Sequence, residues 1–264
     1  MKARSPFQIN RAVIFALVLR EAAQRMGARR LGLCWVVLEP LAHLAIISLM
    51  FAYIRGGHLP GIEYPVFILT GLAPFLLFRN TALRLMDSLK ANRSLFAYKQ
   101  IKPLDTFIAR TLVEACIASA VYLVLIFIFG WFGFDVSIAH PIEWLGTLAL
   151  GLLFSFALGV TLALIVHPLP GAKLFIRMLF FPLYFLSAVL HPASFLPQSL
   201  LPLLLLNPYL HLMELIRAEV FPYYQMVDGI SAQFVMEVTI VLLFISLGVY
   251  RARRFHLIST KNGG

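Results

Sequence analysis

Residues 142–166 read IEWLGTLALGLLFSFALGVTLALIV, an apolar run without lysine or arginine. Crossing the hydrocarbon core of a bilayer takes about 20 consecutive apolar residues. The run is therefore predicted to be a transmembrane helix. Within it, small residues recur at every fourth position, at Gly151, Ser155, Gly159 and Ala163. Such a stripe lets a neighbouring helix approach closely, so its predicted role is packing.

The same length rule identifies five further spans, at residues 33–54, 64–85, 106–130, 172–190 and 234–250. The composition agrees, because 61% of the residues are hydrophobic and 13% are charged. A soluble domain carries about 25% charged residues. Residues 1–264 are therefore predicted to form a single all-α, polytopic membrane domain with six transmembrane helices.

Lysine and arginine alternate between the segments that connect the six runs. They are frequent in residues 1–32, in residues 86–105 and after residue 250, and they are rare in most of the other loops. Cytoplasmic loops of membrane proteins carry an excess of these residues, so both termini are predicted to face the cytoplasm. The net charge of +10 is explained by this topology. It does not indicate a nucleic-acid partner, since the basic residues form no contiguous stripe.

Residues Asn10–Ala28 precede the first span and have an amphipathic pattern. Apolar residues such as Val13 and Leu17 can share one face, while Arg20 and Arg25 remain on a polar face. The pattern predicts a helix that lies along the inner membrane surface within residues 1–32. A cytoplasmic extension of the first span is the alternative.

A seventh apolar run, Phe195–Leu206, is too short to cross a bilayer. Prolines interrupt this region at Pro192, Pro197, Pro202 and Pro208. The pattern predicts a re-entrant or interfacial hairpin after the fifth span. Irregular backbone at membrane depth is tolerated only where protein or a water-filled cavity covers it, so the hairpin is a candidate cavity lining.

The first span contains Glu39, followed by Pro40, and His43 lies one turn further on. A carboxylate at this depth is costly unless it is paired or hydrated. Glu39 could face a transport path. Alternatively it is a structural group paired with an arginine of a neighbouring span, with Pro40 bending the helix.

Further charged residues lie near the inner ends of the second and third spans. Arg79 and Arg84 could extend toward the headgroups, or they could line the path of an anionic substrate. Arg110 and Glu114 are four residues apart, so they are predicted to pair along the third span.

The segment between the second and third spans, Lys90–Asp105, reads KANRSLFAYKQIKPLD. It mixes basic residues with apolar ones that a solvated loop does not need, so it is a candidate docking element for a soluble partner. In the alternative interpretation, its aromatic residues rest among the headgroups. The chain lacks a G-x-x-x-x-G-K-[ST] phosphate loop, an H-E-x-x-H pair and a G-x-S-x-G serine. No catalytic or metal site is therefore predicted, and energy must come from a partner or an ion gradient.

Several motifs together resemble the permease subunits of ABC-2-type polysaccharide exporters, closest to the capsular polysaccharide (KpsM-like) branch. The first two are Arg30-Leu31-Gly32 with Trp35 and Leu38-Glu39-Pro40-Leu41, and Leu69-Thr70-Gly71-Leu72-Ala73-Pro74-Phe75. The third is a late block that comprises Phe181-Pro182, Ser187, Leu196-Pro197, Asn207-Pro208, His211, Glu214 and Arg217. The resemblance covers nearly the whole chain.

This resemblance implies a homodimer in which each permease binds a separate cytoplasmic ABC ATPase subunit, present in two copies. ATP and Mg²⁺ would bind to that subunit, so this chain would hold no cofactor and would not be an enzyme on its own. The implied ATPase-coupling residues are Asn92, Leu95, Phe96, Tyr98 and Lys99. The candidate translocation path between the two permeases includes Glu39, His43, Arg79, Arg84 and Arg217.

The substrate implied by the resemblance is a lipid-linked acidic capsular polysaccharide that crosses the bacterial inner membrane. A periplasmic adaptor and an outer-membrane exporter would act beyond it. The periplasmic hairpin facing the adaptor would include Pro197, Asn207, Pro208, His211 and Glu214. The alternatives are a permease for O-antigen or teichoic acid, an ion-coupled carrier, and an intramembrane enzyme.

Overall fold

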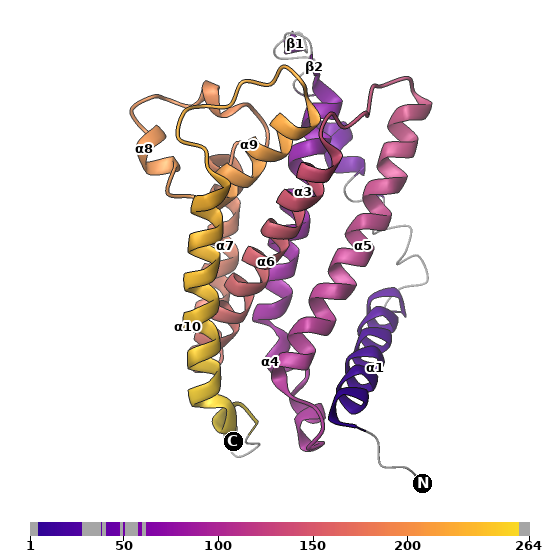
Figure 1. Ribbon diagram of the computed structural model, residues 1–264, viewed down its shortest axis with the longest axis vertical. Coiled ribbons are helices and arrows are strands. Elements are labelled where there is room, and N and C mark those ends of the chain that lie inside the picture. The colour runs from indigo at the N-terminus through magenta and orange to yellow at the C-terminus, as the bar shows by residue number, and fades with distance from the viewer. Residues whose placement is uncertain are drawn as a thin grey trace.

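The computed structural model describes residues 5–27, 38, 41–47, 50, 58–59 and 62–258, and most of them are helical (Figure 1). Four helices in this part of the chain are long and apolar enough to cross a membrane: α3 (Tyr64–Met86), α5 (Pro103–Trp131), α6 (Pro141–Val166) and α10 (Ala232–Ile258). They coincide with the predicted spans at 64–85, 106–130, 142–166 and 234–250. The chain is thus a mostly helical, multi-pass membrane protein.

The other two predicted spans are not established as spans. Most of residues 33–54, including Glu39, lie outside the described residues. The predicted fifth span coincides with α7 (Ala172–Leu186), which has 15 residues. A helix of that length extends about 22 Å, which is shorter than a hydrocarbon core of about 30 Å. A crossing at residues 172–190 would also need the turns that follow Leu186, so six spans stay a prediction.

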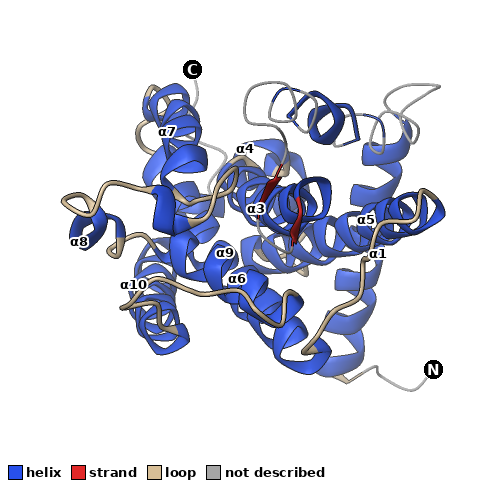
Figure 2. Cartoon of the chain, turned by 90° about the horizontal axis from the view of Figure 1, so that it is seen from above, coloured by secondary structure: helices blue, strands red, loops and turns tan. Residues whose placement is uncertain are grey.

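Helix α3 occupies the middle of the bundle, with α5 and α10 on opposite sides of it (Figure 2). It packs closely on α6 because the small residues of α6 face it. A Cβ atom on Gly151 would overlap the ring of Phe78, and one on Gly159 would lie 2.7 Å from Leu85 Cβ. The predicted packing role of the small-residue stripe is confirmed.

Helices α5 and α10 direct large apolar side chains away from the bundle. On α5, Phe127 is 69% exposed, and on α10, Phe244 is 82% exposed. Water would penalise such surfaces, whereas lipid tails accept them. These two faces are therefore suited to contact with lipid tails or with another apolar surface.

Short elements gather at one end of the bundle, the upper end in Figure 1. The antiparallel pair β1 (His58–Leu59) and β2 (Ile62–Glu63) precedes α3, with His58 opposite Glu63. After α7 the chain forms three elements: η2 (Ala193–Phe195), α8 (Leu201–Leu204) and α9 (Pro208–Val220). Prolines interrupt this segment as the sequence indicates. Whether it re-enters a membrane stays a prediction.

The opposite end of the bundle carries α4 (Ser88–Ala91) and the 3-10 helix η1 (Arg93–Ala97). Helix α1 (Pro6–Gly27) begins at this end and α10 finishes there (Figure 1). The first and last helices and the α3–α5 connection thus share one side, which agrees with the charge pattern. We refer to this side as the inner end, although its exposure to the cytoplasm stays a prediction.

Helix α1 runs beside the inner half of α5 (Figure 1). Its outward side carries Phe7 and Phe15, which are 77% and 64% exposed. Several of its polar side chains point toward the bundle, where they bind α5 and Asn92. The predicted helix therefore forms, with part of its polar face covered by protein, while its position along the membrane surface stays a prediction.

Candidate functional site

The predicted ATPase-coupling segment forms a compact turn at the inner end. Phe96 is only 4% exposed and belongs to a core cluster with Phe107 and Leu257. The ring of Phe96 thus fills the chain's own core, and its role in ATPase coupling stays a prediction. Its burial fixes η1 against α5 and α10.

The solvent-exposed surface of this segment is formed by residues near its C-terminal end. Tyr98 is 66% exposed and Lys99 is also exposed, while Leu95 is half-buried. An exposed aromatic ring beside a cation can pack on a partner and pair with an acidic side chain. Among the five predicted coupling residues, Tyr98 and Lys99 are therefore the best placed for contact with another protein.

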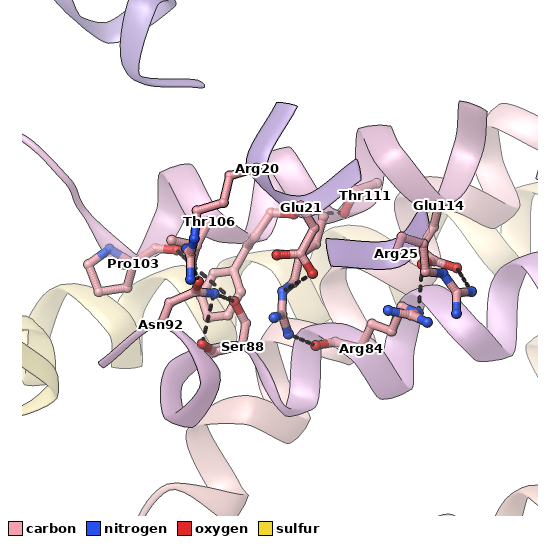
Figure 3. A network of polar contacts seen from close by, with 12 residues as sticks. Arg20, Glu21, Arg25, Arg84, Ser88, Asn92, Pro103, Thr106, Thr111 and Glu114 are labelled. Carbon is pink, nitrogen blue, oxygen red and sulfur yellow. Dashed lines mark hydrogen bonds and ion pairs between the residues drawn. The ribbon is translucent and has the colours of Figure 1, made fainter. Parts of the chain in front are cut away.

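Asn92 links this segment to α1 (Figure 3). Its side-chain Nδ2 donates to the Ser88 carbonyl at 3.1 Å and to Ser88 Oγ at 3.2 Å. Arg20 Nη1, on α1, donates to Asn92 Oδ1 at 2.9 Å. Ser88 Oγ also lies 3.0 Å from Thr106 Oγ1 on α5. Asn92, which is 2% exposed, therefore joins α1, α4 and the start of α5.

Beside Asn92, an ion-pair network connects α1, α3 and α5 (Figure 3). Glu114 Oε1 pairs with Arg84 Nε at 2.6 Å, and Glu114 Oε2 pairs with Arg25 Nη2 at 3.3 Å. Arg110 Nε pairs with Glu21 Oε1 at 3.0 Å. The predicted pairing of Arg110 with Glu114 is thus wrong, since both side chains turn toward neighbouring helices.

The same network includes Arg84, one of the residues predicted to line the translocation path. Arg84 pairs with Glu114, and its carbonyl accepts a hydrogen bond from Arg110 Nη1 at 2.8 Å. In this arrangement Arg84 holds helices together rather than facing a passage. Two carboxylates, Glu21 and Glu114, balance part of the charge of the surrounding arginines, which limits the cost of placing them between helices.

Two other candidate path residues, His43 and Arg79, come together at one groove of about 340 Å³. The groove is lined by charged Arg177 and by aromatic residues of α7, among them Tyr184, whose hydroxyl lies 3.4 Å from His43 Nε2. Among the described residues, Arg79 has no ion-pair or hydrogen-bond partner, and its Nε is buried. An unpaired guanidinium beside aromatic rings can bind an anionic sugar.

Arg217 has a different environment from Arg79, at the outer end. Its side chain is 0% exposed, and it donates to the carbonyls of Ala188 and Val189, the latter at 2.7 Å. Its guanidinium lies 3.8 Å from the centroid of the Phe67 ring. A Cβ on Gly71 would lie 2.6 Å from Arg217 Nη2. This geometry favours a structural role for Arg217, and contact with a passing polymer stays a prediction.

The other residues of the late block fasten the segment between α7 and α10. Asn207 caps α9 by accepting from the Tyr209 amide at 3.0 Å. His211 Nε2 lies 2.7 Å from the Leu205 carbonyl, while Nδ1 accepts from the Ser231 amide at 2.9 Å.

Glu214 is buried in the same region. Its Oε1 accepts from Tyr224 Oη at 2.6 Å and from the Ala193 amide at 3.2 Å. Pro208 occupies the first turn of α9, and Pro197 accepts a turn hydrogen bond from the Leu200 amide. These side chains therefore fix the backbone of the predicted hairpin, and their contact with an adaptor stays a prediction.

The multi-pass bundle, with its connecting segment at the inner end and its braced outer segment, has the architecture of an integral membrane protein. The chain belongs to the ABC-2 type transporter family, whose profile matches residues 12–221. Among its relatives is the polysialic acid transport protein KpsM of Escherichia coli. The two sequences are 38% identical over 251 residues, which cover 95% of this chain and 97% of KpsM.

Two further relatives show how far the similarity extends. The capsule polysaccharide export inner-membrane protein CtrC of Neisseria meningitidis serogroup A is 29% identical over 250 residues, or 91% of each chain. The O-antigen export system permease protein RfbA of Myxococcus xanthus is 24% identical over 250 residues. That match covers 92% of this chain and 93% of RfbA.

Sequence reasoning missed the partners contributed by α1. Arg20, Glu21 and Arg25 read as the polar face of an interface helix, yet each binds another element of the bundle. A signal was present in Glu114, because an acidic residue inside an apolar run requires cations close to it. The sequence could not show that one of those cations comes from 89 residues earlier.

Proposed function

We propose that this chain is the membrane-spanning permease subunit of an ATP-driven ABC exporter. Its substrate would be a lipid-linked acidic capsular polysaccharide, moved across the bacterial inner membrane. The observation that carries the proposal is the 38% identity to a polysialic acid transport protein along nearly the full length of both chains. Two other relatives that support it are named for capsule polysaccharide export.

The proposed assembly contains two copies of this chain and two copies of a cytoplasmic ABC ATPase that binds ATP and Mg²⁺. The exposed Tyr98 and Lys99 support docking of the ATPase at the inner end. Both termini would be cytoplasmic, and residues 33–54 and 172–190 would complete six spans. The hairpin between α7 and α9 would face the periplasm, where an adaptor linked to an outer-membrane exporter could bind.

The proposed path for the polymer includes the groove around Arg79. A polyanionic glycan is too polar for lipid, so its passage requires cations and surfaces on which sugar rings can stack. Arg79 supplies a charge that is unpaired within the described residues, Arg177 adds a cation that is paired with Asp87, and Tyr184 and Phe181 supply aromatic rings at the same groove. Path roles for Glu39 and His43 remain part of the proposal, with Glu39 outside the described residues.

O-antigen export is the second candidate function. The match to RfbA, an O-antigen export system permease, covers 92% of this chain and supports it. Its identity of 24% is lower than the 38% to KpsM, so capsular polysaccharide remains the preferred substrate class.

The function can be tested in cells of the source organism that lack this chain. We expect polysaccharide to disappear from the cell surface and to accumulate inside, and the reintroduced chain to reverse both changes. Chemical analysis of the retained polymer would distinguish capsular polysaccharide from O-antigen. Unchanged surface polysaccharide of both kinds would contradict the proposal.

ATPase docking has its own test. Tyr98→Asp should prevent co-purification of a Walker-motif ATPase with the chain, because it places a carboxylate on the proposed contact surface. Tyr223, which is 94% exposed and lies beyond α9, offers a matched control. Tyr223→Asp should leave the ATPase bound, and equal binding by both variants would remove Tyr98 from the contact.

A further inference from the structure

A cavity at the inner end is separate from both the Arg79 groove and the ion-pair network. It has a volume of about 730 Å³ and lies where α4 and η1 meet the end of α6, the start of α7 and the end of α10. Cavities of roughly 300–1,000 Å³ commonly hold small molecules. The space therefore suits a ligand of that size.

Basic residues from separate elements surround this cavity. They are Lys90, Arg93, Lys173 and Arg253, and the acidic residue in the lining is Asp87. Four cations and one carboxylate leave a charge of +3, with histidine neutral. Asp87 is also already paired, with Lys173 Nζ at 2.8 Å and Arg177 Nη2 at 2.6 Å. It is therefore poorly available to neutralise Lys90 and Arg253.

His167, at the end of α6, reports on the same electrostatic environment. Burial lowers the pKa of its imidazole, and the charges of Arg93 and Arg253 lower it further. Protonation of His167, which would add one more positive charge, is thus disfavoured here, whereas an anion would be stabilised.

The inner wall of the cavity is apolar. Met86, Leu89, Ala163 and Leu257 all line it and are buried in the chain. A small inorganic anion gains nothing from such a wall, whereas an acyl chain does. The wall lies at the ends of α3, α6 and α10 and on α4, and α3, α6 and α10 are long and apolar enough to cross a membrane.

We propose that this cavity binds the phosphate group of an anionic membrane lipid. The basic rim would hold the phosphate, and the apolar wall would contact the start of an acyl chain. Basic pockets between membrane helices on the cytoplasmic side are suited to anionic headgroups. The phosphate could belong to a bilayer phospholipid or to the lipid anchor of an exported polymer. The site does not depend on which polymer the chain exports.

Lipid binding can be measured on the purified full-length chain in neutral detergent. Phosphatidylglycerol, but not phosphatidylcholine, should raise the Tm and appear as a bound species in native mass spectrometry. The double variant Lys90→Gln/Arg253→Gln removes two exposed cations of the rim. Its binding of phosphatidylglycerol should weaken on the order of 25-fold, since each charge contributes about 1 kcal/mol. The control Arg11→Gln/Arg251→Gln removes two exposed charges outside the cavity and should bind as the wild type does.

Three results would overturn the site: equal binding of both lipids, equal losses in the two double variants, or stabilisation by inorganic phosphate as large as that by phosphatidylglycerol. Lipids that co-purify from cells with and without polymer synthesis identify the source of the phosphate. Phosphatidylglycerol in both preparations supports a bilayer lipid, and a glycosylated lipid found only with synthesis supports the anchor. Absence of phosphorus-containing lipid from both would also overturn the assignment.

Discussion

The inner and outer ends of the bundle hold their charged residues in opposite ways. At the inner end, Glu114 binds Arg84 and Arg25, whose side chains are 30% and 26% exposed and come from different helices. At the outer end, Arg217 has no exposed surface, and it binds backbone carbonyls of one short turn and pairs at 3.6 Å with the buried carboxylate of Glu214 on its own helix. The first arrangement joins separate helices in reach of water, whereas the second fixes a single piece of backbone.

This difference indicates different mechanical roles. Ion pairs near water exchange partners at low cost, because solvent compensates for a pair that opens. A fully buried guanidinium cannot leave its acceptors without exposing an uncompensated charge to the interior. We therefore expect the inner network to adjust when a partner moves the α4–η1 segment and the outer block to remain rigid.

The largest effect is expected for Arg217→Ala at the outer end. Removing the guanidinium leaves the carbonyls of Ala188 and Val189 without their donor and the buried carboxylate of Glu214 without its cation, at a cost of about 3–5 kcal/mol. Membrane abundance and Tm should fall, and export should fall in proportion to abundance. Normal abundance with lost export would instead place Arg217 in the transport path.

A smaller loss is expected for Gly71→Ala, which tests the same block without removing a charge. The new Cβ would lie 2.6 Å from Arg217 Nη2 and 2.7 Å from the Val189 carbonyl. Overpacking of this kind costs roughly 1–3 kcal/mol, measurable as a lower Tm in detergent. Gly146→Ala is the matched control, since Gly146 has no heavy atom within 4 Å of its Cβ position. Equal Tm values for the two variants would contradict the close fit around Arg217.

Next in size is Glu114→Gln at the inner end. The two arginines that lose their carboxylate can reach water, so the loss of stability should be about 1–2 kcal/mol, less than for Arg217→Ala. The number of ATP molecules hydrolysed per exported polymer should rise, because α1 is then less firmly joined to the bundle. A double-mutant cycle with Arg25→Gln should show coupling between the two sites. Strict additivity would argue against the pair.

The smallest effect on stability is expected for Arg79→Gln. Arg79 has no ion-pair partner among the described residues, so its replacement should leave Tm and abundance near wild-type values. Surface polysaccharide should nevertheless decrease, because the groove loses a cation. Wild-type export in this variant would remove Arg79 from the path.

The spans that could be predicted are those that local sequence determines. Runs such as residues 142–166 carry their own length and apolarity, and the stripe from Gly151 to Ala163 shows which face packs. Contacts between distant segments could not be predicted in this way. Phe96 was placed among the docking residues from its local sequence. The core that it shares with Phe107 and Leu257 is formed only when these distant segments pack together.

The candidate site was also predicted only in part, because its residues come from segments that are distant in the sequence. His43 and Arg79 were both proposed for the path, and the structure brings them to one groove. Arg84 and Arg217 share the charge of Arg79 but have other neighbours, and residue type alone does not distinguish these cases. The sequence indicated which residues carry charge inside the membrane region, whereas the fold determines the partner of each.

The contrast between a movable inner end and a rigid outer end can be measured directly by hydrogen–deuterium exchange. The chain would be compared alone, with its ATPase, and with its ATPase and ATP. The account predicts that exchange changes in α1 and in residues 88–99 when the ATPase and ATP are added, while residues 187–191 and α9 remain protected throughout. Changes confined to the outer block, with the inner segment unaffected, would contradict it.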